Sequence, residues 1–190
     1  DVYKRQGIIS FLLVAFLFEK VKEISPFVEV SFFNIGEGDS ILIEIPYSFQ
    51  ILIDGGGDFK ILEKLKKEIS FFDRKIEILI LTHPDKDHAL GLFPVLERYE
   101  IDYVFLPKIL GDLKEKPLYE NFLNLAQRKA KKIIFAKKGQ KVFVGKKVKI
   151  SFLWPKENFL SSQSNDFSLV FLFSFGWVDF LFAGDAPKRN

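Results

Sequence analysis

The sequence predicts one α/β or α+β domain in which helices cover packed sheets. The chain has 190 residues, of which 48% are hydrophobic and 28% charged, a balance typical of a globular domain with a real core. Its 23 phenylalanines fall mostly in short alternating or continuous apolar runs, which suit buried strands. Strand patterns come first, strand–helix units follow and strand patterns return, an order that favours sheets covered by helices.

The first half of the chain supplies four strand patterns and two helical ones. The stretch NIGEGD (34–39) is the expected turn between the first two strands, and Gly55 ends the third. Asp58 is a candidate N-cap for the first helix, and Pro94 must lie in the first turn of the second helix or break it. Strands are expected at 28–33, 40–45, 50–54 and 75–81, and helices at 59–69 and 88–99.

The second half predicts one long helix and more strands. A polar loop is expected at 160–166, and the last two strands form a hairpin about Gly176. The amphipathic helix is expected at 118–132. Strands are expected at 102–107, 133–136, 141–144, 147–154, 168–175 and 177–184.

The N-terminal stretch GIISFLLVAFLF (7–18) is a separate, apolar segment that follows Lys4 and Arg5. It resembles a signal-peptide core or the end of a membrane anchor, although it is shorter than the ~20 residues that a full span needs. We therefore expect residues 1–25 to be an anchor or signal-like segment and residues 26–190 to be the domain, facing the outside of a bacterial membrane. The alternative is a buried core helix.

Charge and cysteine content narrow the function classes. The chain has no cysteine, which excludes a disulfide framework and a thiolate zinc site. Residues 121–156 hold eleven Lys and Arg and no Asp or Glu, whereas the rest of the chain is acidic. This asymmetry indicates either a surface for phosphates or acidic lipid, or a solvated helix face followed by lysine-edged strands.

The stretch LTHPDKDHALGL (81–92) contains both histidines of the chain, His83 and His88, with Asp85 and Asp87 between them. It follows a strand pattern directly, and functional groups collect at the carboxyl ends of strands in strand–helix units. His83 and Asp85 are two positions apart and can point the same way. Imidazole and carboxylate both bind divalent ions, so the spacing suits a two-metal site. The alternative is a solvated turn with capping aspartates.

Two more aspartates end strand patterns elsewhere in the chain. Asp54 precedes three glycines, and Asp185 follows Gly184. A carboxylate in the position of Asp185 could bridge two metals. The repeated placement at strand ends strengthens the prediction of a metal site.

Several motifs together resemble a known family. THPDKDH (82–88) resembles the T-H-x-H-x-D-H signature of the metallo-β-lactamase fold, with Asp85 in place of the middle histidine, a form similar to that of the ComEC-type competence proteins. Four further motifs agree in order along the chain, so the resemblance runs from Val28 to Ala186. These motifs are FFNIGEGDSILIE (32–44), ILIDGG (51–56), SNDFSLVF (164–171) and FLFAGDA (180–186).

The resemblance implies a metallo-β-lactamase-like αββα four-layer sandwich with two divalent ions, zinc or manganese, at the edge of the sheets. Carried over by position, His83 and Asp85 would hold one metal, and Asp87 and His88 the other. Asp185 would bridge the two metals.

The resemblance also implies supporting residues. Asp54 would support the site by hydrogen bonding, and Asn165 and Ser168 would lie near it. The family pattern continues past the Gly-Asp-Ala motif into a His-His-Gly-Ser motif that this sequence does not contain, so we expect the domain to be incomplete at its C-terminal end.

These implications lead to a metal-dependent hydrolase, most simply a phosphodiesterase or nuclease linked to DNA uptake, with Asp87 orienting or deprotonating the attacking water. DNA or another phosphodiester would be its substrate, residues 7–18 would contact the membrane, and the sequence indicates no protein partner. One alternative is a metallo-hydrolase of another ester or thioester, since one fold hosts many activities. The other is a membrane-tethered domain that binds DNA or a partner without catalysis.

Overall fold

The computed structural model describes residues 7–13, 27–46 and 48–188. Residues 7–13 are helical and exposed, and the rest of the predicted N-terminal segment lies outside the described residues. None of the described helices combines the length and the apolar character needed to cross a membrane.

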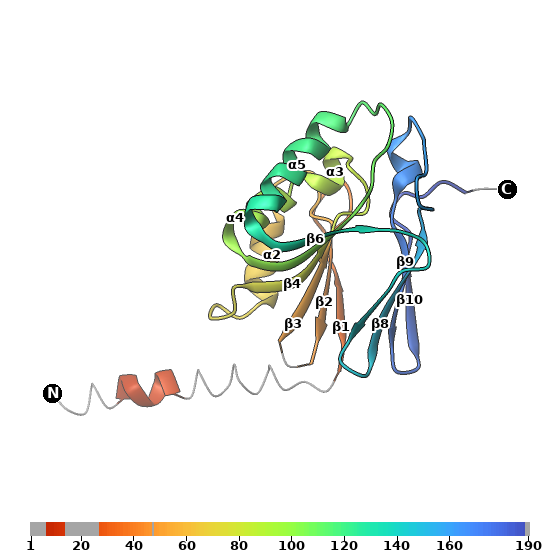
Figure 1. Cartoon of the computed structure of the whole chain (residues 1–190). Coiled ribbons are helices and arrows are strands. Elements are labelled where there is room, and N and C mark those ends of the chain that lie inside the picture. Colours follow the sequence, from red (N-terminus) through yellow and green to blue (C-terminus); the bar gives the residue numbers. More distant parts are fainter. Residues whose placement is uncertain (1–6, 14–26, 47, 189–190) are drawn as a thin grey trace.

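A mixed six-stranded sheet forms the centre of the domain (Figure 1). Its strands follow one another in sequence order, the first two pairs antiparallel and the remaining three parallel. The parallel pairs need the helical crossovers that the sequence predicts. The strands are β1 (Glu29–Phe32), β2 (Ile41–Ile45), β3 (Phe49–Ile53), β4 (Lys75–Ile80), β5 (Glu100–Pro107) and β6 (Ala130–Ala136).

A second, antiparallel sheet of four strands packs against one face of the first (Figure 1). The order of its strands is β10-β9-β8-β7, and the final hairpin turns at Gly176 as predicted. The strands are β7 (Lys141–Val144), β8 (Val148–Trp154), β9 (Val170–Phe175) and β10 (Val178–Phe182).

Four helices cover the other face of the six-stranded sheet (Figure 1). The described residues thus form helix, sheet and sheet layers, three of the four layers of an αββα sandwich, and the predicted α/β class is confirmed. A short 3-10 helix, η1 (Ser164–Phe167), lies in the predicted polar loop. The helices are α2 (Ile61–Glu68), α3 (Lys86–Ala89), α4 (Leu92–Arg98) and α5 (Lys116–Lys129).

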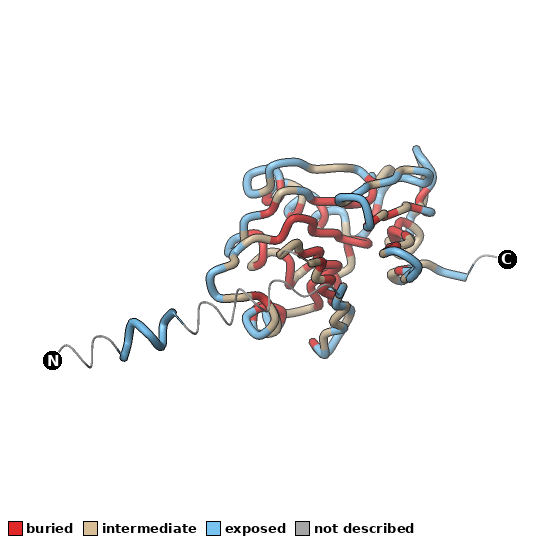
Figure 2. The backbone as a smooth tube through the Cα atoms, turned by 90° about the horizontal axis from the view of Figure 1, so that it is seen from below, coloured by how far each residue is buried: buried red, intermediate tan, exposed pale blue. Residues whose placement is uncertain are grey.

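Two apolar cores hold the layers together, and β4 contributes to both. Leu79 faces the helices, whereas Ile78 and Ile80 face the second sheet, as the two-residue period of a strand requires. Each fully buried aliphatic side chain stabilises the fold by about 1.5–3 kcal/mol. In Figure 2 the buried backbone accordingly runs through the middle of the domain.

The prediction of one continuous helix at 88–99 is wrong. This stretch is divided into α3 and α4, with Gly91 between them. Gly91 packs so closely on Gly55 that a Cβ there would lie 1.8 Å from the Gly55 carbonyl oxygen. This long-range contact bends the chain. Pro94 is the third residue of α4, within the first turn, where a missing N–H is tolerated.

The two ends of the sandwich differ. The chain leaves β3, β4 and β10 at one end, where the predicted aspartates and histidines gather. The turns that join β7 to β8 and β9 to β10 lie at the opposite end, together with the start of β1 (Figure 1). We refer to these as the metal end and the turn end.

Candidate metal centre

Two separate parts of the chain bring the central side chains together at the metal end. Both histidines lie just after β4, His83 in the connecting loop and His88 in α3. Asp185 arrives from the end of β10, after Gly184, whose φ of +49° suits glycine. A Cβ on Gly184 would lie 3.1 Å from the side chain of Thr82, so the glycine lets the two segments approach.

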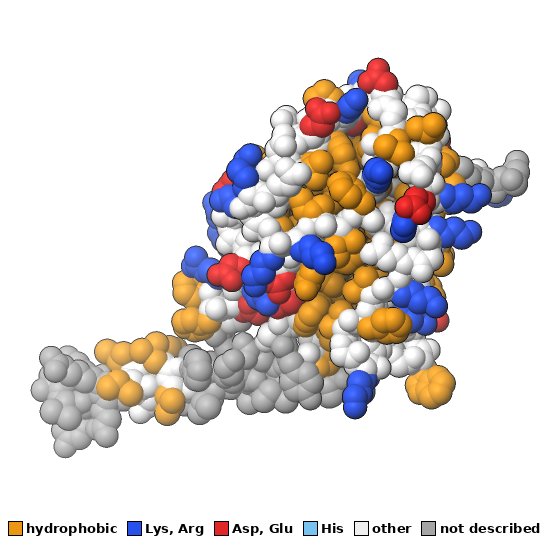
Figure 3. Space-filling model, viewed as in Figure 1, with side chains coloured by type: hydrophobic (Ala, Val, Ile, Leu, Met, Phe, Trp, Pro, Cys, Tyr) orange, Lys and Arg blue, Asp and Glu red, His pale blue; other side chains and the backbone are white. Residues whose placement is uncertain are grey.

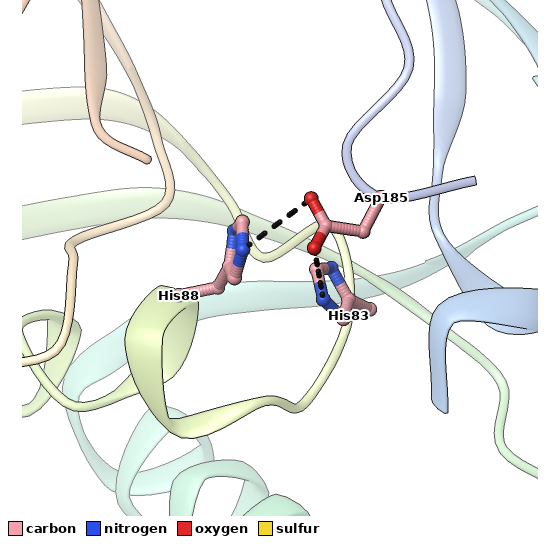
Figure 4. Close-up of side chains that lie close together, drawn as sticks. All are labelled: His83, His88 and Asp185. Atoms are coloured by element: carbon pink, nitrogen blue, oxygen red, sulfur yellow. Dashed lines mark ion pairs between the residues drawn. The ribbon is translucent and has the colours of Figure 1, made fainter. Parts of the chain in front are cut away.

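Asp185 lies between the two imidazoles and turns a different carboxylate oxygen to each (Figure 4). Its Oδ1 is 3.6 Å from Nε2 of His88, and its Oδ2 is 3.9 Å from Nε2 of His83. One ligand atom from each of the three residues lies within 4.8 Å of the others, a spacing that could hold a metal ion. Nitrogen and carboxylate oxygen are ordinary ligands for zinc.

Each histidine also has its own aspartate. Oδ2 of Asp85 is 3.6 Å from Nε2 of His83, and Oδ2 of Asp87 is 3.9 Å from Nε2 of His88. The side chains of Asp85, Asp87 and Asp185 are 28%, 44% and 42% exposed, whereas both histidines are buried. The site therefore has two similar halves, each with one histidine and one aspartate, that share Asp185.

Asp54 orients the imidazole of His88 through a hydrogen bond to Nδ1, the ring nitrogen that does not face Asp185. This buried side chain follows β3, and its Oδ2 lies 3.0 Å from Nδ1 of His88. Because a carboxylate oxygen accepts, His88 donates from Nδ1, so that in its neutral form the lone pair lies on Nε2, which faces Asp185. Asp54 also accepts from the backbone N–H of Thr82 at 2.8 Å and from its hydroxyl at 2.6 Å.

Thr82 connects Asp54 to His83, because its hydroxyl contacts both side chains and thereby sets the tautomer of His83. Since the Thr82 hydroxyl donates to Asp54, its oxygen is left to accept from Nδ1 of His83, 3.0 Å away. His83 then keeps its lone pair on Nε2 as well. Both histidines thus point a metal-binding nitrogen into the same space, through a network that starts at Asp54.

Unsatisfied buried atoms show that the residues fit a cation. Nε2 of His83 and Oδ1 of Asp85 are buried and have no hydrogen-bond partner among the described residues. Leaving such atoms unpaired costs about 1–3 kcal/mol each. A divalent cation in contact with both would satisfy them.

The two histidines differ in their affinity for a proton. Burial lowers the pKa of His83, and the nearby His88 lowers it further. Burial also acts to lower the pKa of His88, but the hydrogen bond and charge of Asp54, with the charges of Asp185 and Asp87, outweigh it and raise the pKa to about 9. A metal ion at His88 must therefore displace a proton at neutral pH.

Glycine loops pack against the backbone of the aspartate cluster. Gly38 has φ +78°, and a Cβ there would lie 1.7 Å from the carbonyl oxygen of Asp87. The Gly57 N–H donates to the Glu37 carbonyl, and the Gly55 N–H donates to the His88 carbonyl at 2.8 Å. The turn at 34–39 and the glycines after β3 therefore set the position of the ligand loop.

The structure joins six of the eight predicted site residues in one set of close polar contacts, namely His83, Asp85, Asp87, His88, Asp185 and Asp54. Ser168 is fully buried beside Gly184, where a Cβ on the glycine would lie 3.4 Å away. Asn165 lies in η1, and its Oδ1 is buried without a hydrogen-bond partner among the described residues. Among the residues that the structure describes, no hydrogen bond or ion pair joins the Asn165 side chain to the cluster. Thr82 was not predicted, although a hydroxyl residue directly before a ligand histidine could have indicated it.

The basic residues at 121–156 spread over α5, β6 and the β7–β8 hairpin. Lys129, Lys131 and Lys137 form ion pairs with Glu97, Asp102 and Glu157. In Figure 3 blue side chains are scattered around an orange band and do not form one patch on this face. This distribution is that of a largely solvated surface.

Comparisons with known proteins identify a family and related folds. A family model described as "Metallo-beta-lactamase superfamily" matches residues 34–159. ComE operon protein 3 of Bacillus subtilis is 28% identical over 179 residues, covering 85% of this chain. The chain spans about a fifth of that relative, 22% of its length.

Solved structures share the fold at low sequence identity. A Cronobacter sakazakii enzyme described as a metallo-β-lactamase with a HARLDQ motif has a TM-score of 0.56, 16% identity and coverage of 84% of this chain and 60% of its own. The Rm3 metallo-β-lactamase has a TM-score of 0.53 and 16% identity, and the match covers 82% of this chain and 58% of the lactamase. Zn²⁺-bound PqqB from Methylobacterium extorquens has a TM-score of 0.52 and 12% identity, and the match covers 76% of this chain and 48% of PqqB.

Proposed function

Because the chain belongs to the metallo-β-lactamase superfamily, whose members are largely metal-dependent hydrolases, we propose that it is a two-metal phosphodiesterase that acts on DNA or a related phosphodiester. The family resemblance read from the motifs is confirmed, and with it the likeness to the ComEC-type proteins. One observation carries the proposal: Asp185 presents one oxygen to each of two histidines, each of which has its own aspartate.

The residues present define which groups would hold the ions. His83 and Asp85 would bind one divalent cation, His88 and Asp87 the other, and Asp185 both. When bound, such a pair supplies charge neutralisation and the activation of water. With neutral histidines, the charges of Asp54, Asp85, Asp87 and Asp185 balance two divalent cations. An oxygen-rich set of this kind accepts manganese as well as zinc.

The chain's own groups would do the rest of the chemistry. Asp87 is 44% exposed and lies 3.9 Å from Nε2 of His88, so one of its oxygens can accept a proton from a water molecule and hold it. Asp54 and Thr82 keep both imidazoles oriented. The likeness to ComEC-type proteins supports DNA as the substrate and a role in DNA uptake.

A substrate comparison tests the proposal. The chain loaded with zinc or with manganese is assayed on single-stranded DNA, a simple phosphodiester, a neutral ester, a lactone and a thioester. We expect hydrolysis of the phosphodiesters, weakened by salt for DNA, and loss of turnover in Asp87→Asn. Asp58→Asn is the control, because Asp58 is exposed and pairs with Lys60.

Two outcomes would contradict the proposal. Hydrolysis of only the neutral substrates would identify a hydrolase of another ester class. Retention of metal with no turnover on any substrate would identify a binding domain without catalysis.

A further inference from the structure

Aromatic side chains protrude from two loops at the turn end. Phe71 and Phe72, between α2 and β4, are each 73% exposed, and Trp177 in the β9–β10 turn is fully exposed. Exposed aromatic groups that share one end of a domain suit contacts with other molecules or with membranes. In Figure 3 orange side chains protrude along this lower end, next to blue ones.

The loop that carries the two phenylalanines is held in shape. Asp73 accepts from the side-chain amide of Gln50 at 3.0 Å and from the backbone N–H of Lys75 at 3.1 Å. These bonds turn the only acidic side chain of the loop toward the sheet. The Arg74 guanidinium lies 5.6 Å from the centre of the Phe71 ring, and the two phenylalanine rings pack edge to face.

Cations accompany the aromatic groups. Arg74 is exposed in the first loop, and Lys146 and Lys147 are exposed in the β7–β8 turn. Three carboxylates are also exposed near this end, Glu29, Glu100 and Asp179 in the first residues of β1, β5 and β10. The end is therefore mixed, but its turns at 70–74 and 145–147 carry three cations against Asp73 alone. Aromatic groups flanked by Lys and Arg are typical of protein surfaces at the interface of an anionic membrane.

Chain connectivity favours a membrane over a protein partner. The apolar stretch 7–18 joins the domain through Phe27 and the start of β1, which lies at the turn end because Glu29 pairs with Glu44 near the end of β2. The aromatic groups also occupy separate protruding turns, a shape suited to entering a layer of lipid headgroups.

We propose that the turn end docks on an anionic lipid surface, with Phe71, Phe72 and Trp177 inserted at the headgroup level and Arg74, Lys146 and Lys147 facing the phosphates. The metal end then faces away from the membrane, open to a substrate in solution. This inference does not depend on which bond the site hydrolyses.

Tryptophan fluorescence tests the insertion directly. The chain has two tryptophans, and Trp154 is partly buried, with Nε1 donating to the Asp166 carbonyl at 2.7 Å. The difference between the spectra of the chain and of Trp177→Phe therefore reports on Trp177. With vesicles of equal phosphatidylcholine and phosphatidylglycerol, we expect its emission to shift to the blue and to be quenched by brominated acyl chains. Unchanged Trp177 emission on vesicle-bound chain would overturn the proposal, since residues 7–18 would then bind alone.

The partitioning of variants onto vesicles is a second test of the proposed docking surface. Replacing Phe71 and Phe72 by Ser should lower the partition coefficient of the full chain about ten- to a hundredfold. Phe59→Ser is the matched control, because Phe59 is 68% exposed but lies before α2 at the metal end. Equal partitioning of all variants, or an equal loss in Phe59→Ser, would refute the docking surface. Thermal unfolding followed by circular dichroism checks that each variant is folded.

Discussion

Asp54 and His88 face each other across 3.0 Å, with Nδ1 of the histidine directed at Oδ2 of the aspartate. Both side chains are almost fully buried, and the same Asp54 oxygen accepts from the Thr82 hydroxyl. A residue that need not touch a metal thus controls the tautomer of one ligand directly and of the other through Thr82.

Substituting Asn for Asp54 tests this control. The amide keeps the shape but loses the charge and one acceptor, so His88 is held less firmly. We expect metal affinity, measured by competition with a chelator, to fall about 10- to 100-fold. Asp58→Asn should leave the affinity unchanged. If Asp54→Asn binds metal like the unaltered chain while remaining folded, the supporting role of Asp54 is wrong.

Thr82 offers a cleaner comparison, because one substitution retains the hydroxyl and another, isosteric with threonine, removes it. Thr82→Ser retains the donor to Asp54 and the acceptor for His83, so metal affinity should be largely preserved. Thr82→Val leaves buried partners unpaired, which costs about 1–3 kcal/mol of stability, and should also weaken metal binding. Chelator competition and urea unfolding measure the two effects. Equal metal affinities for Thr82→Ser and Thr82→Val would show that the Thr82 hydroxyl does not orient the histidines.

Metal counting tests the division of the site into halves. The chain should retain two ions, Asp85→Asn and Asp87→Asn one each, and Asp185→Ala none, because among the described carboxylates Asp185 alone lies within 4 Å of a nitrogen of each histidine. Elemental analysis after removal of free metal gives the count. A single ion in the unaltered chain, or full retention by Asp185→Ala, would contradict the arrangement.

The order of strands and helices could be predicted from the sequence because apolar periodicity reflects burial. The strand predicted at 75–81 is β4, Lys75–Ile80, and the cluster that follows it lies at the carboxyl end of the strand, as expected. The proximity of Asp185 to His83 and His88 was predicted through a family resemblance, since no local pattern relates residues about a hundred positions apart.

Contacts between distant backbone segments could not be predicted in this way. The break between α3 and α4 arises where Gly91 meets Gly55, and helical spacing alone favours one continuous helix across it. The role of Thr82 depends on the side chains that surround its hydroxyl, and these come from two different strand ends. Sequence patterns show which side chains are buried, but they do not show the partners of each one.

Proton binding by the metal-free chain gives a further prediction. Asp54 and the neighbouring carboxylates overcome burial and raise the pKa of His88 from 6.5 to about 9, whereas burial lowers the pKa of His83. With only two histidines in the chain, NMR should show one imidazole titrating near 9 and the other below 6.5. Two imidazoles that both titrate near 6.5 would contradict the geometry.

The same shift makes the stability of the metal-free chain depend on pH. Because the folded-state pKa of His88 is raised, its contribution is complete below pH 6.5 and is lost as the pH rises through about 9. The contribution is about 3 kcal/mol, so urea unfolding should show a less stable chain above pH 9 than near pH 6.5. Bound metal should abolish this dependence on His88, since the ion replaces the proton.

Gly38 links the turn at 34–39 to the metal site, and Gly139 provides a matched control. Both have positive φ, +78° and +88°, so alanine at either position should cost about 1–2 kcal/mol of stability through backbone strain. A Cβ at Gly38 would also lie 1.7 Å from the Asp87 carbonyl oxygen, whereas nothing lies within 4 Å of one at Gly139. Gly38→Ala should therefore displace the Asp87 loop and weaken metal binding, while Gly139→Ala should retain full affinity. Equal metal affinities for the two variants, compared at matched folded fractions, would show that the turn does not position Asp87.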